Sequence, residues 1–156
     1  MSDGRHIVCP TCHATNRVPY DRPADQAKCG SCHEPLFQGR PIHLGGQAFY
    51  KHIAQSDVPV LVDFSADWCA PCRAMEPVLA RAASELEPEV RIANVDTQAS
   101  PDIAGRYGIR AIPTLILFKG GAELGRVSGA MDLGRLLSWV YQTMGNGVWT
   151  GVAGSA

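Results

Sequence analysis

The chain has 156 residues, of which 46% are hydrophobic and 19% are charged, the balance of a globular protein and not of a disordered one. Its 14 Lys and Arg residues nearly match its 15 Asp and Glu residues, so the net charge of −1 excludes a general attraction to nucleic acid. No apolar run approaches the roughly 20 residues that span a bilayer, and we expect no membrane contact.

Residues 1–40 contain too few hydrophobic side chains to fold on apolar burial alone. They carry two Cys-x-x-Cys pairs separated by sixteen residues, which is the spacing of a four-cysteine zinc ribbon. Thiolate coordination would supply the folding free energy that the segment lacks. We therefore predict a small zinc-ribbon domain over residues 1–40, with a structural Zn²⁺ ion held by four ligands: Cys9, Cys12, Cys29 and Cys32.

A histidine follows each of these pairs, so both also match the Cys-x-x-Cys-His signature of haem attachment. This mostly polar segment of 40 residues has too few apolar side chains to enclose two haems. We therefore favour zinc over haem and over plain disulfides. Because four cysteines complete a tetrahedron, we expect His13 and His33 to be solvent-exposed. The first residues lack the features of a secretory signal, so the expected location is the cytoplasm.

The rest of the chain predicts a linker followed by alternating strands and helices. We expect a linker over 41–46, helices over 47–55, 69–86, 100–107 and 130–144, strands over 60–64, 90–96, 112–118 and 123–127, and a flexible tail over 145–156. Helices between extended segments indicate parallel strands, and Gly120-Gly121 indicates a tight hairpin. The prediction for residues 47–144 is an α/β fold whose central mixed sheet is flanked by helices on both faces.

A third Cys-x-x-Cys pair stands where the strand over 60–64 gives way to a helix. A thiol at a helix start lies close to unpaired N–H groups and to the positive end of the helix dipole, which favour the thiolate. We therefore expect Cys69 to be the nucleophile and Cys72 the resolving thiol, with a redox-active Cys69–Cys72 disulfide as the oxidised form. Pro71 suits the first turn of the helix because its φ is fixed and it has no N–H.

Asp63 is the single polar residue within the apolar strand over 60–64. Burial disfavours the charged form of a carboxyl group, so its pKa should be raised. Burying an unpaired carboxylate also costs several kcal/mol of folding free energy, so a purely structural purpose for Asp63 is hard to supply. We expect Asp63 to exchange a proton with Cys72, with a satisfied structural carboxylate as the alternative.

Taken together, these features resemble the thioredoxins, and more narrowly the long bacterial thioredoxin-2 type with an N-terminal zinc-binding extension. The resemblance rests on Val-Asp-Phe-Ser-Ala-Asp-Trp-Cys-Ala-Pro-Cys, on Pro77, on Tyr-Gly-Ile-Arg-Ala-Ile-Pro-Thr and on Phe-Lys-Gly-Gly. It departs at Ala70, where glycine is commonest, and at Ile92, where a lysine often lies near the buried aspartate. The resemblance implies a thioredoxin fold preceded by the zinc ribbon.

The resemblance further implies a cis peptide between Ile112 and Pro113 that faces the dithiol. It implies an apolar groove for extended substrate peptides, framed by Trp68, Pro71, Ile112, Gly129 and Ala130. The implied activity is that of a protein-disulfide reductase that acts on disulfide-containing proteins and is recharged by thioredoxin reductase. We expect a monomer that binds no nucleic acid.

Three alternatives remain open from the sequence. Oxidation of the ribbon cysteines could eject the metal, which would make the chain a redox-sensing zinc switch or chaperone. The ribbon could instead be an adaptor that carries the thioredoxin domain. Oxidase or isomerase activity would use the same dithiol and differ in redox potential.

Overall fold

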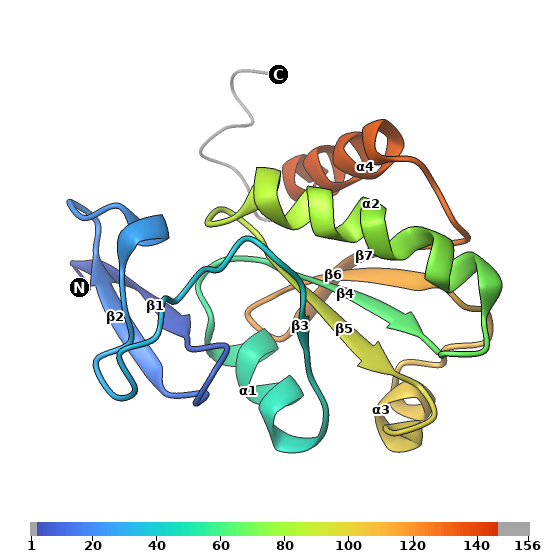
Figure 1. The fold of residues 1–156 in the computed structure, drawn as a ribbon, viewed down its shortest axis with the longest axis horizontal. Helices are drawn as coiled ribbons and strands as arrows, with labels where there is room; N and C mark the ends of the chain where they lie inside the picture. Colours follow the sequence, from blue (N-terminus) through green and yellow to red (C-terminus); the bar gives the residue numbers. More distant parts are fainter. Residues whose placement is uncertain (1–2, 147–156) are drawn as a thin grey trace.

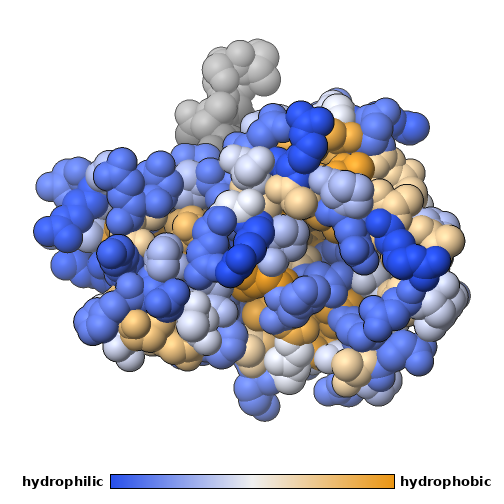
Figure 2. Space-filling view, viewed as in Figure 1, coloured by the Kyte–Doolittle hydropathy of each residue, from blue (hydrophilic) through white to orange (hydrophobic). Residues whose placement is uncertain are grey.

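The computed structural model describes residues 3–146 of the chain. A small unit, residues 3–40 and here called the ribbon, lies at one end of a larger α/β unit, residues 41–146 and here called the body (Figure 1). In the view of Figure 2, mostly hydrophilic residues cover the ribbon, whereas patches of hydrophobic residues show among hydrophilic ones over the body.

Two antiparallel strands open the ribbon, β1 (Gly4–Val8) and β2 (Thr15–Pro19). A 3₁₀ turn over Ala24–Gln26 and an isolated bridge between Lys28 and Pro35 follow them. The buried apolar side chains of this unit, apart from cysteines, are Ile7, Val8, Val18, Ala24, Leu36 and Phe37. So small a core agrees with the prediction that the ribbon needs a further source of stability.

The body is built on a five-stranded sheet in the order β3-β5-β4-β6-β7. The strands are β3 (Ile42–His43), β4 (Val60–Ser65), β5 (Arg91–Asp96), β6 (Thr114–Lys119) and β7 (Ala122–Ser128). The strands β3, β5 and β4 pair in parallel, while β6 pairs antiparallel with both β4 and β7. The predicted mixed sheet is therefore confirmed. Central β4 is buried on both faces, which explains its almost continuous apolar sequence.

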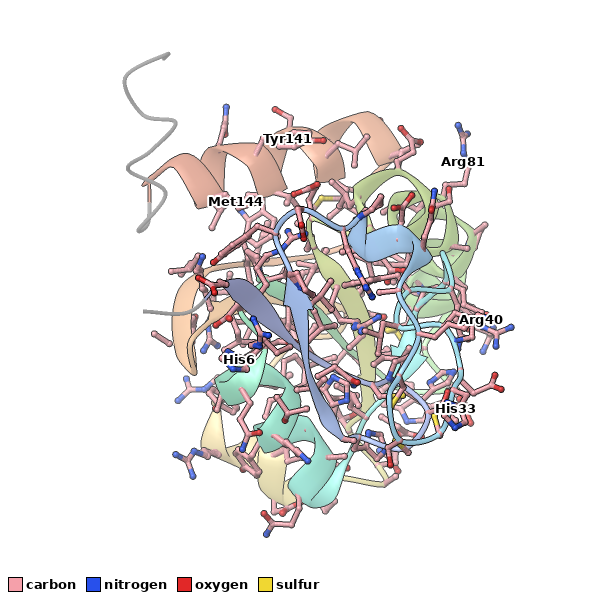
Figure 3. All side chains as sticks on the ribbon, turned by 90° about the vertical axis from the view of Figure 1, so that its left-hand side faces the viewer. His6, His33, Arg40, Arg81, Tyr141 and Met144 are labelled. Atoms are coloured by element: carbon pink, nitrogen blue, oxygen red, sulfur yellow. A yellow bond between two sulfur atoms is a disulfide. The ribbon has the colours of Figure 1, made fainter. Side chains whose placement is uncertain are left out.

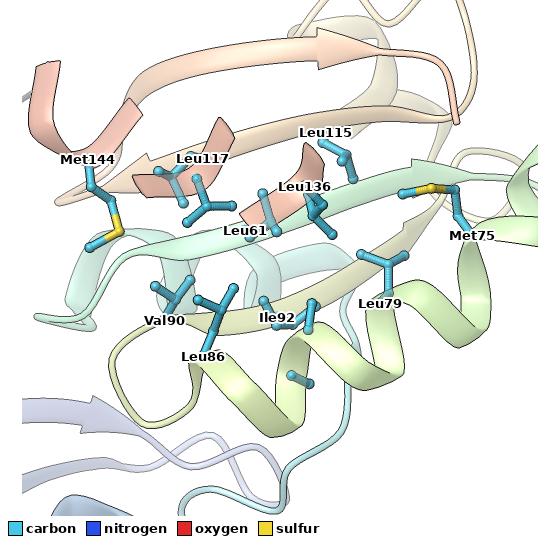
Figure 4. Packing of buried hydrophobic residues seen from close by; sticks show 13 residues of the cluster. Leu61, Met75, Leu79, Leu86, Val90, Ile92, Leu115, Leu117, Leu136 and Met144 are labelled. Carbon is cyan, nitrogen blue, oxygen red and sulfur yellow. The ribbon is translucent and has the colours of Figure 1, made fainter. Parts of the chain in front are cut away.

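Helices cover both faces of this sheet (Figure 1). They are α1 (Gly46–Gln55), α2 (Ala70–Leu86), α3 (Pro101–Arg106) and α4 (Leu133–Asn146). Figure 4 shows the aliphatic cluster that α2 and α4 form with one face, around Leu61, Leu79 and Leu136. The cluster on the other face includes Phe49 of α1 and Ile103 of α3. Within residues 3–146, no helix is both long enough and apolar enough to cross a membrane.

The element boundaries differ from the prediction by one or two residues in most elements and by more in two regions. The segment predicted as a linker, 41–46, contains β3, because two of its residues pair with β5. A strand of two residues is too short to be recognised from alternating hydrophobicity. The last helix begins at Leu133 rather than at residue 130, and it continues to Asn146, inside the predicted tail. Residues 147–156, the rest of that predicted tail, lie outside the described residues.

The ribbon packs against the end of the sheet at which β4 and β5 begin. The N–H of His6 donates to Asp57 Oδ2 at 2.6 Å, and the N–H of Asp57 donates to His6 O at 2.8 Å. Arg91, the first residue of β5, is fully buried, and its guanidinium lies 4.3 Å from the centre of the Phe37 ring. Because β4 has six residues that rise about 3.3 Å each, its other end lies roughly 20 Å from this contact.

Candidate functional site

The dithiol lies at that other end, where α2 begins just after β4. Cys69 is the N-cap residue of α2, and Cys72 lies in the first turn. The two form a disulfide, with Cα atoms 5.2 Å apart, and both are buried. The N–H of Cys72 donates a hydrogen bond to Cys69 Sγ at 3.2 Å. A sulfur at a helix start with an N–H donor is in an environment that stabilises the thiolate once the disulfide is reduced.

One predicted groove residue, Ile112, lies against the dithiol, and a second, Gly129, is bonded to the neighbouring Pro113. The Ile112–Pro113 peptide is cis, the isomer that the resemblance implies. The carbonyl oxygen of Ile112 is 3.8 Å from Cys69 Sγ. Gly129 has a positive φ of 97°, and its N–H donates to the carbonyl oxygen of Pro113 at 2.9 Å. The loop between β7 and α4 is thereby joined to the cis-proline segment beside the sulfur.

The other predicted groove residues are exposed on the surface. Trp68 directly precedes Cys69, Pro71 directly precedes Cys72, and Ala130 follows Gly129 in the loop before α4. Trp68 is 66% exposed, which is a large fraction for a tryptophan. A rigid aromatic side chain that remains in water beside a reactive centre is well suited to bind part of a partner.

Asp63 is buried in β4, at 2% exposure, as expected for a residue inside this strand. Burial raises its pKa from 3.8 to about 6, a hydrogen bond from Asn94 opposes this rise, and the negative charge of Glu76 adds to it. Its Oδ1 atom has no hydrogen-bond partner within the described residues. A carboxyl group with a pKa near neutrality can take up and release a proton at physiological pH.

The residue that contacts this carboxyl group was not predicted. Asn94, on β5, donates from Nδ2 to Asp63 Oδ2 at 3.0 Å, whereas Ile92 lies in the aliphatic core. Arg91 contacts the ribbon and does not contact Asp63. The sequence holds one hint, since Asn94 is the single uncharged polar residue of an otherwise apolar strand core. Its partner depends on strand register, which a linear pattern does not give.

The four ribbon cysteines converge on one point. Their Sγ atoms all lie within 4.8 Å of one another, and the pairs Cys9–Cys32 and Cys12–Cys29 are 3.6 Å apart. A disulfide would bring two sulfurs to about 2.05 Å. A tetrahedral zinc with bonds of about 2.3 Å to sulfur would place its ligands about 3.8 Å apart. The donor set and its spacing therefore fit zinc.

Each Cys-x-x-Cys pair forms the same tight turn. Two backbone N–H groups donate to Cys9 Sγ, at 3.3 and 3.4 Å, and two donate to Cys29 Sγ, at 3.3 and 3.5 Å. Asn16 adds a side-chain donor to Cys29 Sγ at 3.4 Å. The N–H of Cys32, with these other donors, lowers the pKa of Cys29 to about 6. These donors favour thiolates, the form that binds metal.

The histidine that ends each turn has a left-handed backbone conformation, with φ of 66° at His13 and 69° at His33. His33 is exposed, as expected, and lies at the surface in Figure 3, which looks onto the ribbon from its outer side. His13 differs from the expectation, because it is half-buried and its Nδ1 lies 3.1 Å from Nε2 of the buried His52 of α1. Neither histidine belongs to the sulfur cluster.

Two family sequence models match the chain. The model described as Thioredoxin matches residues 40–142, and the model described as Thioredoxin 2, N-terminal, matches residues 8–34. The chain belongs to the thioredoxin family. This thioredoxin is therefore a thiol-disulfide oxidoreductase, and its N-terminal unit is of the zinc-ribbon type.

Curated and solved relatives agree with this assignment. This thioredoxin is 41% identical over 138 residues to Thioredoxin C-3 of Corynebacterium nephridii, which covers 88% of this chain and 94% of that one. It is 47% identical over 83 residues to Thioredoxin 1 of a Nostoc species, covering 53% and 78% of the two chains. A solved mutant thioredoxin of Halobacterium salinarum matches with a TM-score of 0.62 at 31% identity, over 69% of this chain and 93% of that one.

Proposed function

We propose that this thioredoxin reduces disulfides of other proteins through a mixed disulfide. In the reduced protein, the Cys69 thiolate attacks one sulfur of a substrate disulfide, that S–S bond breaks, and the other substrate sulfur leaves as a thiolate that takes up a proton. Cys72 then attacks Cys69 Sγ, which releases the second substrate thiolate and forms the Cys69–Cys72 disulfide. Two electrons have passed from the dithiol to the substrate.

The observation that carries this proposal is the hydrogen bond from the Cys72 N–H to Cys69 Sγ at the start of α2. The same donor and the helix dipole would lower the pKa of the Cys69 thiol in the reduced protein. Cys69 and Cys72 are almost equally buried, at 5% and 3% exposure, and they differ in position: Cys69 is the N-cap residue outside the helix, and Cys72 lies inside the first turn. This difference supports the assignment of Cys69 as nucleophile and Cys72 as resolving thiol.

Asp63 would accept the proton that Cys72 loses when it resolves the mixed disulfide. Its raised pKa supports this role, because a base is most effective when its pKa lies near the working pH. Trp68, Pro71, Ile112, Gly129 and Ala130 would bind the substrate peptide around the sulfur. Ile112 has the clearest support, because its carbonyl oxygen lies beside Cys69 Sγ.

In the ribbon, Cys9, Cys12, Cys29 and Cys32 would hold a structural Zn²⁺ ion. When bound, zinc would crosslink two turns that have only a small apolar core between them. The ribbon lies at the opposite end of β4 from the dithiol, which supports a structural purpose for the metal. The partners we propose are disulfide-containing proteins and a thioredoxin reductase that recharges the dithiol in the cytoplasm, and we propose that the protein acts as a monomer.

Reduction of insulin by dithiothreitol, followed by turbidity, tests this proposal. We expect the zinc-loaded protein to accelerate precipitation, Cys69→Ser to abolish the acceleration, and Cys72→Ser to abolish turnover. Cys12→Ser is the matched control, since it makes the same substitution at a cysteine of the ribbon, and we expect it to retain most of the activity. Full activity in Cys69→Ser, or equal losses in Cys69→Ser and Cys12→Ser, would contradict the proposal.

A further inference from the structure

A row of polar side chains crosses three neighbouring strands of the sheet. His43 on β3, Asn94 on β5 and Asp63 on β4 are register partners. Residues that are opposite one another in parallel strands place their side chains on the same face of the sheet. Exposure falls along the row, from the exposed His43 through the half-buried Asn94 to the buried Asp63. The row therefore connects the buried carboxyl group with the edge of the sheet.

The contacts of Asn94 define the direction of its side-chain amide. Its Nδ2 atom donates to Asp63 Oδ2 at 3.0 Å and to Ser65 Oγ at 2.6 Å. Its Oδ1 atom faces His43 Nδ1 at 3.3 Å, a distance that suits a hydrogen bond donated by the imidazole. A flipped amide would turn its oxygen toward the Asp63 carboxylate and toward the Asp63 carbonyl oxygen, which lies 3.2 Å from Asn94 Nδ2, whereas His43 can match either orientation by its tautomer. These contacts therefore favour the orientation that gives Asp63 a donor.

The other neighbours of Asp63 offer its carboxylate little support. On β6 its register partner is the apolar Leu115, and from α2 the charge of Glu76 disfavours a second negative charge. Within residues 3–146, no Lys or Arg forms an ion pair with Asp63, and no residue hydrogen-bonds its Oδ1. Asn94 is consequently the one side chain of the described residues that donates a hydrogen bond to this carboxyl group.

We propose that Asn94 is a positioning residue that holds the Asp63 carboxyl group and sets the pH range in which it can accept the proton of Cys72. A neutral amide stabilises a carboxylate less than an ammonium group does, yet it leaves the carboxyl group able to change protonation near neutral pH. His43 and Ser65 act on Asp63 only through Asn94, by holding its amide. This inference rests on the proposed function of Asp63 as the proton acceptor.

Replacing Asn94 with leucine tests this role, because leucine has a similar size and no donor. The protonation of Asp63 is followed in the reduced, zinc-loaded full chain by ¹³C resonances of labelled aspartate carboxyl groups, with Asp63→Asn used to assign the resonance. Loss of the donor should raise the pKa of Asp63 by about one unit, since the carboxylate loses its hydrogen bond. The pH profile of insulin reduction should move upward by the same amount, with the loss largest near pH 6 and small near pH 8.5.

Two further variants guard against a general loss of structure. Asn94→Ser keeps a smaller donor and should fall between the native protein and Asn94→Leu. Thr97→Val is the matched control, because Thr97 contacts the backbone of Ser65 and lies outside the row; it should leave both the pKa and the profile unchanged.

An unchanged pKa in Asn94→Leu, or an activity loss that is equal at every pH, would overturn the role of Asn94. A raised pKa with an unmoved profile would support the contact between Asn94 and Asp63, and it would contradict the proposed function of Asp63. The two failures are therefore distinguishable.

Discussion

Replacing Arg91 with alanine tests the contact between the ribbon and the body. Arg91 is fully buried, and its Nη2 donates to the carbonyl oxygen of Val8 at 3.0 Å, while its guanidinium covers the Phe37 ring. Its Nη1 lies 3.7 Å from Glu87 Oε2, and the Glu87 side chain is 3% exposed. The Arg91→Ala variant would remove the contacts that one side chain makes with both units and would leave a buried acid without its counter-ion.

The expected loss of stability is about 3 kcal/mol. Removal of one partner from a buried ion pair costs about 3–5 kcal/mol. The lower end applies here because the pair is separated by 3.7 Å and Glu87 keeps a hydrogen bond from the N–H of Gly39 at 3.0 Å. Burial also raises the pKa of Glu87, so the carboxyl group can take up a proton once the arginine is absent.

Urea unfolding of the zinc-loaded protein at neutral pH, followed by far-ultraviolet circular dichroism, measures this loss. Arg81→Ala is the matched control, because Arg81 and Glu85 form an exposed pair one helical turn apart, and it should change stability by less than about 0.5 kcal/mol. The double variant Arg91→Met with Glu87→Gln should recover stability relative to Arg91→Met alone, since it removes the unpaired acid. Equal stabilities of Arg91→Ala and the native protein would refute the reasoning.

Three further predictions concern the two sites. Asp63→Asn should be more stable than the native protein by about 3 kcal/mol at pH 8. The folded-state pKa of Asp63 is raised from 3.8 to about 6, so the native protein binds this proton more tightly than the unfolded chain does and loses stability as pH rises through this window. Urea unfolding at pH 4 and pH 8 checks this, and a difference that does not shrink at pH 4 would contradict it. Trp68→Ala should lower kcat/KM for insulin about tenfold. Because the Trp68 ring is 66% exposed, the free energy of unfolding should change by less than about 0.5 kcal/mol. The control is Tyr141→Ala, at 59% exposure on α4, which should change neither quantity. Chelation of zinc should lower the unfolding temperature, measured by calorimetry, and leave most of the insulin reduction intact; parallel loss of both would contradict a purely structural metal.

The sequence predicts the dithiol and the sulfur cluster because local patterns determine both. Cys69 and Cys72 follow an apolar strand and begin a helix, and each ribbon turn needs only two cysteines at fixed spacing with a permissive backbone. The same holds for the mixed sheet, since strand type and helix alternation can be recognised within short windows.

The contacts that were not predicted all depend on distant segments. Asn94 meets Asp63 only through the register of β4 and β5, and β3 is recognisable as a strand only because β5 lies beside it. Arg91 would be expected at a surface from its charge, yet the ribbon covers it with Phe37 and Val8. His13 is half-buried for the same reason, because α1 places His52 against it. The contacts between the ribbon and the body could therefore not be predicted from local sequence patterns.

The arrangement of the two sulfur centres bears on the alternative functions. The ribbon contacts the start of β4, while the dithiol lies beyond its end, about 20 Å away. Within residues 3–146, the four ribbon cysteines are free and the dithiol pair forms the disulfide. This separation favours a reductase with a structural metal over a zinc switch in which the two centres exchange disulfides directly.

Mapping the mixed disulfide of the Cys72→Ser variant tests the central claim most directly. The zinc-loaded variant is incubated with a disulfide-bonded peptide, and mass spectrometry then identifies the cysteine that carries the peptide and the amount of metal that remains bound. We predict that Cys69 alone carries the peptide and that about one zinc ion per chain is retained. A peptide attached to Cys9, Cys12, Cys29 or Cys32, with release of zinc in proportion, would contradict the account.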